Sequence, residues 1–298
     1  MNYKIGFLGP EGTFTQQAAQ QLVPKECCTL LPYPSIADVL LSADQGEIDG
    51  AVVPIENSIE GSVNLTVDFL ANQVDLGIVK EVVVPISHSL LVSPGTKLHQ
   101  IRKIFSHPQA LAQCHQYMRE YFPHIETESV NSTAKAAQMV QEAGSHEFAA
   151  IGTVLAADIY DLTILAANIQ DRTNNNTRFV FAAKNWRDLL EFVKTETEPW
   201  KIATMITLGK DYPGALYEVL RSFAQEEINL TKIESRPTKR QLGTYYFLID
   251  FYGELHDPRV QRAFAGIEKT GSALRILGNY QLLTFSPIKK AGVTEHTR

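Results

Sequence analysis

The sequence predicts an α/β protein of two domains, and three observations support this fold class. The chain of 298 residues is long for one ordinary domain, and its 44% apolar content is enough to fill two cores. Short β-branched runs alternate with helical segments through the first part of the chain. After Trp200 the order changes to strand, helix, strand, strand, helix, strand, which is typical of a small ferredoxin-like domain.

In the first domain, apolar strands alternate with helices. Thr13 or Thr15 is suited to cap the first helix, and residues 50–55 are apolar enough for a strand covered on both faces. The strand that begins at Arg178 closes the series. Strands are predicted at residues 3–8, 50–55, 76–84, 89–92, 102–105 and 147–151, and helices at 14–22, 35–43, 63–71, 109–121 and 132–143.

The stretch between Trp186 and Trp200 mixes charges with Thr and Pro, which predicts a connecting segment. In the second domain we expect strands at residues 202–208, 230–235, 244–252 and 274–285, and helices at 213–226 and 258–269. Such a sheet leaves its other face or its edges available for pairing with a second copy of the chain. The expected division is a first domain at residues 1–186, a linker at 187–199, a second domain at 200–286 and a polar tail at 287–298.

The composition narrows the class of partner. A net charge of -6 and a pI near 5.8, with no basic block longer than Lys289 and Lys290, oppose binding to nucleic acid or to an anionic membrane. No apolar run approaches the roughly 20 residues that span a bilayer, and the N-terminus lacks the pattern of a secretory signal. The histidines show no metal-ligand spacing. We therefore expect a cytoplasmic, metal-free protein with a small-molecule partner.

Two motifs follow predicted strands in the first domain. "GPEGTFT" at residues 9–15 lies between a strand and a helix, where backbone N–H groups can hold an anion, although an ordinary turn is an equally common explanation. Glu56 and Asn57 follow the strand at 50–55, at the end of the sheet where α/β proteins gather ligand groups. The alternative is that Asn57 only shapes a turn.

A third motif, "FSHPQALAQC", gives a strand end, a turn and a helix. Gln109 and Gln113 are four residues apart, so both amides share one helix face with which Ser106 could form a cleft. A Ser-His-Asp triad is disfavoured, because the adjacent Ser106 and His107 point in different directions and no Gly-x-Ser-x-Gly elbow is present. His107 is better explained by a structural role.

The stretch "NNNTRFVF" joins a turn to a strand at Thr177. The asparagines at 174–176 tolerate turn or left-handed backbone, and the residues after Thr177 favour a sheet. This places a hydroxyl, and the guanidinium of Arg178, at the start of a strand, a location suited to a cleft between two lobes. The alternative explanation of the same stretch is an Asn-rich loop exposed to solvent.

Taken together and in this order, "GPEGTF", "PIENS", "SHPQALAQC", "DRTNNNTRF", "GALY" and "ESRP" resemble the prephenate dehydratase family with a C-terminal ACT domain, over nearly the whole chain. The resemblance implies two lobes like a type II periplasmic binding protein, a cleft between them and no cofactor. It implies conversion of prephenate to phenylpyruvate in L-phenylalanine biosynthesis, with feedback inhibition by L-phenylalanine between ACT domains of a homo-oligomer, either dimer or tetramer. The chorismate mutase helices fused to some relatives are missing, so we expect a monofunctional enzyme.

The resemblance also assigns roles to residues, one by one. Tyr217 departs from the pattern, because the family usually has valine there, and this position bears on the affinity for the effector and on its identity. The implied catalytic residues are Thr177, Glu56, Asn57, Ser106 and Gln113, and the implied substrate-binding residues are Arg178, Phe179 and Thr13. The implied L-phenylalanine site is Gly214, Ala215, Leu216, Asn229, Leu230, Glu234, Ser235, Arg236 and Pro237.

The chemistry of prephenate suits neutral donors. Loss of CO2 and water leaves an aromatic ring, so the reaction needs no electron sink, and the enzyme has to hold a dianion and assist the departing hydroxide. We assign Thr177 to the leaving hydroxyl. Arg178 clamps a carboxylate if it faces the cleft and is structural if it points to the opposite face of its strand. Two alternatives stay open, namely arogenate dehydratase, which acts on the amino analogue, and a noncatalytic amino-acid sensor.

Overall fold

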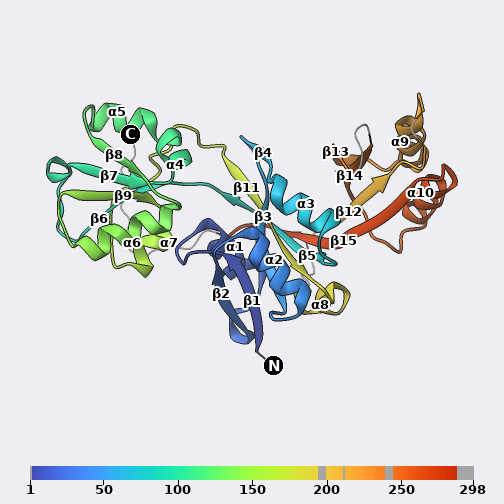
Figure 1. The fold of residues 1–298 in the computed structure, drawn as a ribbon, viewed down its shortest axis with the longest axis horizontal. Coiled ribbons are helices and arrows are strands. Elements are labelled where there is room, and N and C mark those ends of the chain that lie inside the picture. The colour runs from blue at the N-terminus through green and yellow to red at the C-terminus, as the bar shows by residue number, and fades with distance from the viewer. Residues whose placement is uncertain (1, 194–198, 211, 239–243, 287–298) are drawn as a thin grey trace.

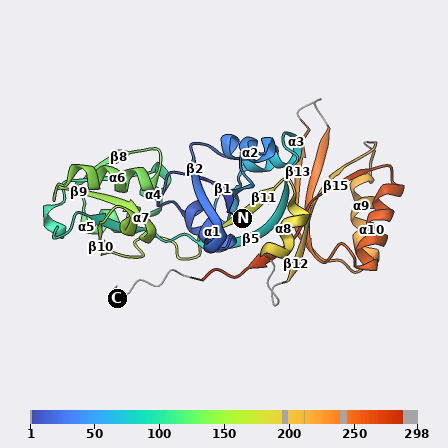
Figure 2. The same cartoon turned by 90° about the horizontal axis from the view of Figure 1, so that it is seen from below.

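The computed structural model describes residues 2–193, 199–210, 212–238 and 244–286, so the predicted tail at 287–298 lies outside the described residues. The described chain forms three bodies in a row: a second lobe, a first lobe and a C-terminal domain (Figures 1 and 2). Helices that could cross a bilayer are not found in the part of the chain that the structure describes. The α/β class, the two lobes and the additional small domain are confirmed.

The first lobe is a mixed sheet in the order β5-β11-β3-β1-β2. β1 runs parallel to β2 and β3, and the late strand β11 inserts antiparallel between β3 and β5. The edge strand β2 was not predicted, because its half-exposed residues show no clean alternation. The elements are β1 Tyr3–Leu8, α1 Phe14–Leu22, β2 Cys28–Tyr33, α2 Ile36–Gln45, β3 Gly50–Asn57, β4 Gly61–Ser62, α3 Asn64–Asn72, β5 Gly77–Pro85 and β11 Asn176–Ala183.

The second lobe is inserted between β5 and β11 and has its own sheet, in the order β10-β6-β9-β7-β8. The single helix predicted at 109–121 is divided at Cys114, and the fully exposed strand β8 was not predicted. The elements are β6 Ser89–Val92, β7 Lys103–Ser106, α4 Pro108–Gln113, α5 His115–Tyr121, β8 Glu126–Ser129, α6 Thr133–Ala143, β9 Phe148–Gly152, α7 Val154–Ile159 and β10 Thr163–Ala166, with a short 3-10 turn at Leu98–Gln100. The 3-10 turn at Lys25–Cys27 belongs to the first lobe, between α1 and β2.

The C-terminal domain has the predicted βαββαβ order. Its strands lie in the order β13-β14-β12-β15, and its two helices cover the outer face of the sheet, away from the first lobe (Figure 2). The elements are β12 Trp200–Thr207, α9 Ala215–Gln225, β13 Leu230–Pro237, β14 Tyr245–Tyr252, α10 Pro258–Lys269 and β15 Ala273–Leu283.

The C-terminal domain and the first lobe share one sheet and one core. β15 pairs with β12 on one side and runs parallel to β5 on the other, so the two sheets join into one of 10 strands. The inner face of the C-terminal sheet packs Leu248 and Leu277 against Leu70 and Ile78 of the first lobe. The inner face of the C-terminal sheet and its β15 edge are therefore covered by the same chain, and β13 is the edge strand of the joined sheet on the side of the C-terminal domain.

The predicted linker at 187–199 begins inside a helix, α8 Trp186–Val193. The indole of Trp186 packs against Gly77, where a Cβ atom would lie 2.2 Å from the ring, and Leu189 joins the core of the first lobe. These apolar contacts explain why a charged stretch becomes helical here. Residues 194–198 lie outside the described residues.

Candidate active site

A cavity of about 780 Å³ lies between the two lobes. Its walls come from the loop before α1, the ends of β3 and β11, the segment between β5 and β6, and the first turns of α4 and α6. Five of the predicted residues line it: Thr13, Asn57, Gln113, Thr177 and Phe179. The sequence motifs therefore meet in one place although they are far apart along the chain.

Thr177 and Asn57 face each other across neighbouring strands. They are direct partners in the antiparallel register of β11 and β3. The backbone N–H groups of Ile59 and Glu60 donate to Asn57 Oδ1 at 2.9 and 3.1 Å, so the other atom of that amide is the donor. Asn57 Nδ2 donates to Thr177 Oγ1 at 2.9 Å. The Thr177 oxygen thus accepts a bond, and its own proton is committed to no acceptor in the described residues.

The same amide orientation fixes the rest of the cluster. Asn57 Nδ2 also donates to Asn175 Oδ1 at 2.8 Å, and Asn175 Nδ2 donates to Gln113 Oε1 at 3.3 Å. Because Gln113 presents its oxygen, the contact of 3.0 Å to His88 Nε2 requires a proton on that nitrogen. A chain of hydrogen bonds therefore connects the Thr177 hydroxyl to the second lobe: donation runs outward from the Asn57 amide, and Gln113 Oε1 accepts at the far end from both Asn175 and His88.

His88 lies in the cavity wall and was not singled out by the sequence. Its side chain is almost fully buried, its ring packs edge-on against Phe14 at 5.6 Å between centroids, and Nδ1 has no hydrogen-bond partner among the residues that the structure describes. Burial lowers the pKa of His88 below its usual value, against a smaller opposite effect of the Gln113 bond. His88 is therefore neutral at pH 7. Its position directly after a buried strand was the available signal.

The remaining cavity residues supply one positive charge. Thr13 caps α1, accepting from Gln16 N at 3.3 Å, and lines the cavity as predicted. Lys135, in the first turn of α6, is the one Lys or Arg among the described lining residues, and its Nζ bonds Gln138 Oε1 at 3.1 Å. None of the described lining residues is Asp or Glu. The sequence reasoning missed Lys135, because a capped helix start with a lysine is common on any surface.

Ser106 is not a donor to the cavity. Its hydroxyl is fully buried and donates to the Ile151 carbonyl at 2.7 Å, so its proton is used within the second lobe. This corrects its prediction as a catalytic donor. Gln109 and Gln113 both line the cavity, as the helix periodicity indicated. His107 caps α4 by accepting from Gln109 N, as expected of a structural residue, and it lines the cavity as well.

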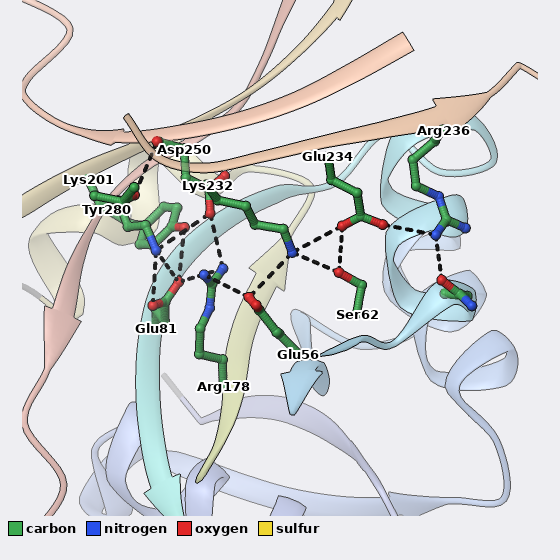
Figure 3. A network of polar contacts seen from close by, with 12 residues as sticks. Glu56, Ser62, Glu81, Arg178, Lys201, Lys232, Glu234, Arg236, Asp250 and Tyr280 are labelled. Carbon is green, nitrogen blue, oxygen red and sulfur yellow. Dashed lines mark hydrogen bonds and ion pairs between the residues drawn. The ribbon is translucent and has the colours of Figure 1, made fainter. Parts of the chain in front are cut away.

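Arg178 also lies outside the cavity lining. It follows Thr177 on β11, and consecutive strand residues point to opposite faces. Its guanidinium contacts Glu56 at 3.1 Å and Asp250 of the C-terminal domain at 3.1 Å (Figure 3). This corrects its prediction as a substrate clamp. Glu56 likewise lies outside the cavity lining and contacts Arg178, which corrects its prediction as a catalytic residue.

The predicted L-phenylalanine residues are divided between two faces of the C-terminal sheet. Gly214, Ala215 and Leu216 line a second cavity of about 680 Å³, with Tyr245 and Phe247 of β14. Ser235 and Pro237 pair with those two β14 residues and share their face. Glu234 and Arg236 alternate with them and point to the first lobe, where Arg236 contacts Asp68 at 2.7 Å (Figure 3). Asn229 and Leu230 do not line the second cavity. In this chain, the expected effector site of nine residues is therefore not one contiguous surface.

The fold and the site define a class: a two-lobed α/β protein with a cavity between its lobes and a C-terminal ferredoxin-like domain. The prephenate dehydratase family model matches residues 5–186, and the ACT domain model matches residues 204–268. The chain therefore belongs to the prephenate dehydratase family.

Individual relatives agree with this assignment. The chain is 40% identical to prephenate dehydratase from Lactococcus lactis subsp. lactis, over 93% of this chain and 97% of the relative. It is 38% identical to the Bacillus subtilis enzyme of the same name, over 93% and 98%. A crystal structure of prephenate dehydratase from Arthrobacter aurescens in complex with L-Phe is 38% identical, has a TM-score of 0.81, and matches 93% of this chain and 90% of that one.

Proposed function

We propose that the chain converts prephenate to phenylpyruvate, CO2 and water in L-phenylalanine biosynthesis. The ring carboxylate leaves as CO2, its C–C bond pair enters the ring, and the C–O bond on the opposite carbon breaks, so that the ring becomes aromatic. The departing hydroxide needs a hydrogen bond or a proton. The observation that supports this function is the Thr177 hydroxyl, which is held by Asn57 and has its own proton uncommitted at the cavity wall.

The charges of the cavity favour prephenate over its amino analogue arogenate. Prephenate is a dianion, and Lys135 is placed to pair with one of its carboxylates, in the role first given to Arg178. An ammonium group on the substrate is best matched by a carboxylate, and the described lining has none. A noncatalytic sensor would bind prephenate without forming phenylpyruvate, so turnover separates it from the enzyme.

The test is to incubate the purified protein with prephenate and, separately, with arogenate. Phenylpyruvate is followed through its enolate absorbance in alkali, and phenylalanine from arogenate by chromatography. We expect turnover of prephenate at least about tenfold more efficient than that of arogenate, equivalent to about 1.4 kcal/mol. If a correctly folded protein forms no phenylpyruvate, the proposed prephenate dehydratase activity is excluded. If arogenate is turned over faster than prephenate, arogenate is the substrate instead.

The C-terminal domain is proposed to carry feedback inhibition by L-phenylalanine. The second cavity contains the Gly214–Leu216 turn, and Tyr217, Ile233 and Tyr245 are exposed apolar residues of this domain, which suits a contact with a second copy of the chain. We propose a homo-oligomer, dimer or tetramer, with residues 1–186 catalytic and 200–286 regulatory, in the cytoplasm. Sedimentation with and without L-phenylalanine tests this; inhibition of a protein that stays monomeric contradicts the proposed bridging.

A further inference from the structure

Two consecutive cross-strand residue pairs of β3 and β11, called rungs below, point to different parts of the molecule. In the first rung, Thr177 faces Asn57 and both line the active-site cavity. In the next rung, Arg178 faces Glu56 and both side chains point to the C-terminal domain (Figure 3). Glu56 and Asn57 are neighbours on β3, and Thr177 and Arg178 are neighbours on β11. A displacement of the second rung therefore displaces the first.

The second rung is held by buried charges of the C-terminal domain. Arg178 contacts Asp250 of β14 at 3.1 Å, Glu56 at 3.1 Å and Glu81 of β5 at 3.4 Å, with only 17% of its side chain exposed. Burial alone would lower the pKa of Arg178, but the nearby negative charges, Glu81 foremost, raise it, so the guanidinium stays charged. Lys201 of β12 completes this group by contacting Glu81 at 3.3 Å and Asp250 at 3.5 Å.

The other member of the rung, Glu56, is held by β13. Lys232 Nζ contacts Glu56 at 3.3 Å, donates to Ser62 Oγ at 2.8 Å and contacts Glu234 at 3.2 Å. Arg236 extends the contact to α3. β13 therefore presents Lys232, Glu234 and Arg236 to the first lobe and, on its opposite face, Ser235 and Pro237 to the neighbours of the second cavity.

Buried ion pairs of this kind are poor sources of stability, because the cost of removing charges from water offsets most of the attraction. They do fix geometry, since moving one partner leaves an unpaired buried charge. A group of charges that joins two domains directly behind a catalytic strand is therefore better explained by control of that strand than by stabilisation.

We propose that Arg178 and Glu56 are positioning residues through which the C-terminal domain controls the Thr177 and Asn57 donors, with Asp250 and Lys232 as its two points of attachment. The proposal rests on the proposed function, because it concerns inhibition of that reaction by L-phenylalanine. A change in the C-terminal sheet moves Asp250 and Lys232, and with them the donors. Displacement of a catalytic group by about 1 Å is enough to lower the rate roughly a hundredfold.

The test is the variant Asp250→Asn, which keeps the side-chain volume and removes the charge. We expect native binding of L-phenylalanine by calorimetry, a kcat that falls about tenfold while KM stays within about twofold, and maximal inhibition weakened about fivefold or more. Arg262→Gln is the matched control, because it breaks an exposed ion pair with Glu226 in the same domain. It is expected to leave all three quantities unchanged.

The outcomes separate this proposal from the proposed function. No phenylpyruvate from the native protein refutes the proposed reaction. Native turnover that does not respond to L-phenylalanine leaves the reaction standing and refutes the proposed feedback inhibition together with the coupling. Asp250→Asn with unchanged kcat and unchanged inhibition also refutes the coupling, as does loss of effector binding in that variant. If circular dichroism shows that Asp250→Asn does not fold, Lys232→Met carries the same expectations, and native inhibition in that variant refutes the proposal.

Discussion

At the scale of single residues, the site depends on the direction of hydrogen bonds more than on the number of polar groups. The backbone around Asn57 decides which end of its amide is the donor, and this choice passes through Asn175 and Gln113 to the His88 ring. The result is a Thr177 hydroxyl that accepts from Asn57 and whose own proton is given to no acceptor among the described residues at the cavity wall. A chain of this kind preorganises a donor at no cost during the reaction.

The first prediction concerns this hydroxyl. Thr177→Val keeps the shape and the β-propensity of the residue and removes the donor, so we expect kcat to fall about a hundredfold, equivalent to about 3 kcal/mol. Thr177→Ser retains the hydroxyl and is expected to recover most of the rate. Steady-state kinetics with thermal unfolding as a folding check measures both. Near-native turnover by a folded valine variant contradicts the role of Thr177.

The second prediction concerns the neutral state of His88. Because burial lowers its pKa in the folded protein, the unfolded chain takes up the proton first as the pH falls below about 6.5. The unfolding free energy is therefore unaffected by His88 titration above that pH, and it decreases as the pH falls below it, because protonation favours the unfolded chain. We expect urea unfolding to show a steeper loss of stability between pH 7 and pH 5.5 in the native chain than in His88→Gln. Equal slopes in the two proteins contradict this effect.

At the scale of elements, the junction of the two sheets depends on Gly278 in β15. A Cβ atom at this position would lie 2.5 Å from the Ile78 carbonyl oxygen of β5, so the strands cannot remain at their present distance with a larger residue. We expect Gly278→Ala to lose about 1 to 3 kcal/mol of unfolding free energy. Gly253→Ala is the control, because its nearest neighbour is a side-chain atom of Val260 at 3.3 Å. Equal stability of the two variants in urea contradicts the close approach.

The elements also show how far the sequence alone leads. The βαββαβ order and most first-domain strands were predicted, because buried strands and amphipathic helices have distinct periods. Strands β2 and β8 were not, because an edge strand with exposed side chains lacks that pattern. Among the site residues, Thr177 and Arg178 are neighbours, and only the position of the C-terminal domain decides which faces the cavity. Lys135 belongs to no local motif, and the one sequence signal for His88 was its position after a buried strand, so the fold was needed to bring both residues to the site.

At the scale of the whole molecule, the first lobe and the C-terminal domain form one folding unit. They share a sheet through β15 and a core in which Tyr246 and Tyr280 pack with residues of β3, β5 and α3. We expect calorimetry to show both melting in a single transition, and hydrogen exchange to show their strands losing protection together. A separate, earlier transition of residues 200–286 contradicts a shared core.

The second lobe is joined to this unit in a different way. Its entrance and its exit meet at one point, where the Ile86 N–H donates to the Asn175 carbonyl at 2.9 Å, next to the Pro85 and Asn176 pair of β5 and β11. The geometry there is that of a β-hairpin whose turn has been replaced by ninety or so residues of additional chain, roughly 86 to 175. A tight turn between residues 85 and 176 therefore closes the gap. The shortened protein lacks the second-lobe wall of the active-site cavity and keeps all strands of the joined sheet. It therefore allows effector binding to be studied in isolation from catalysis.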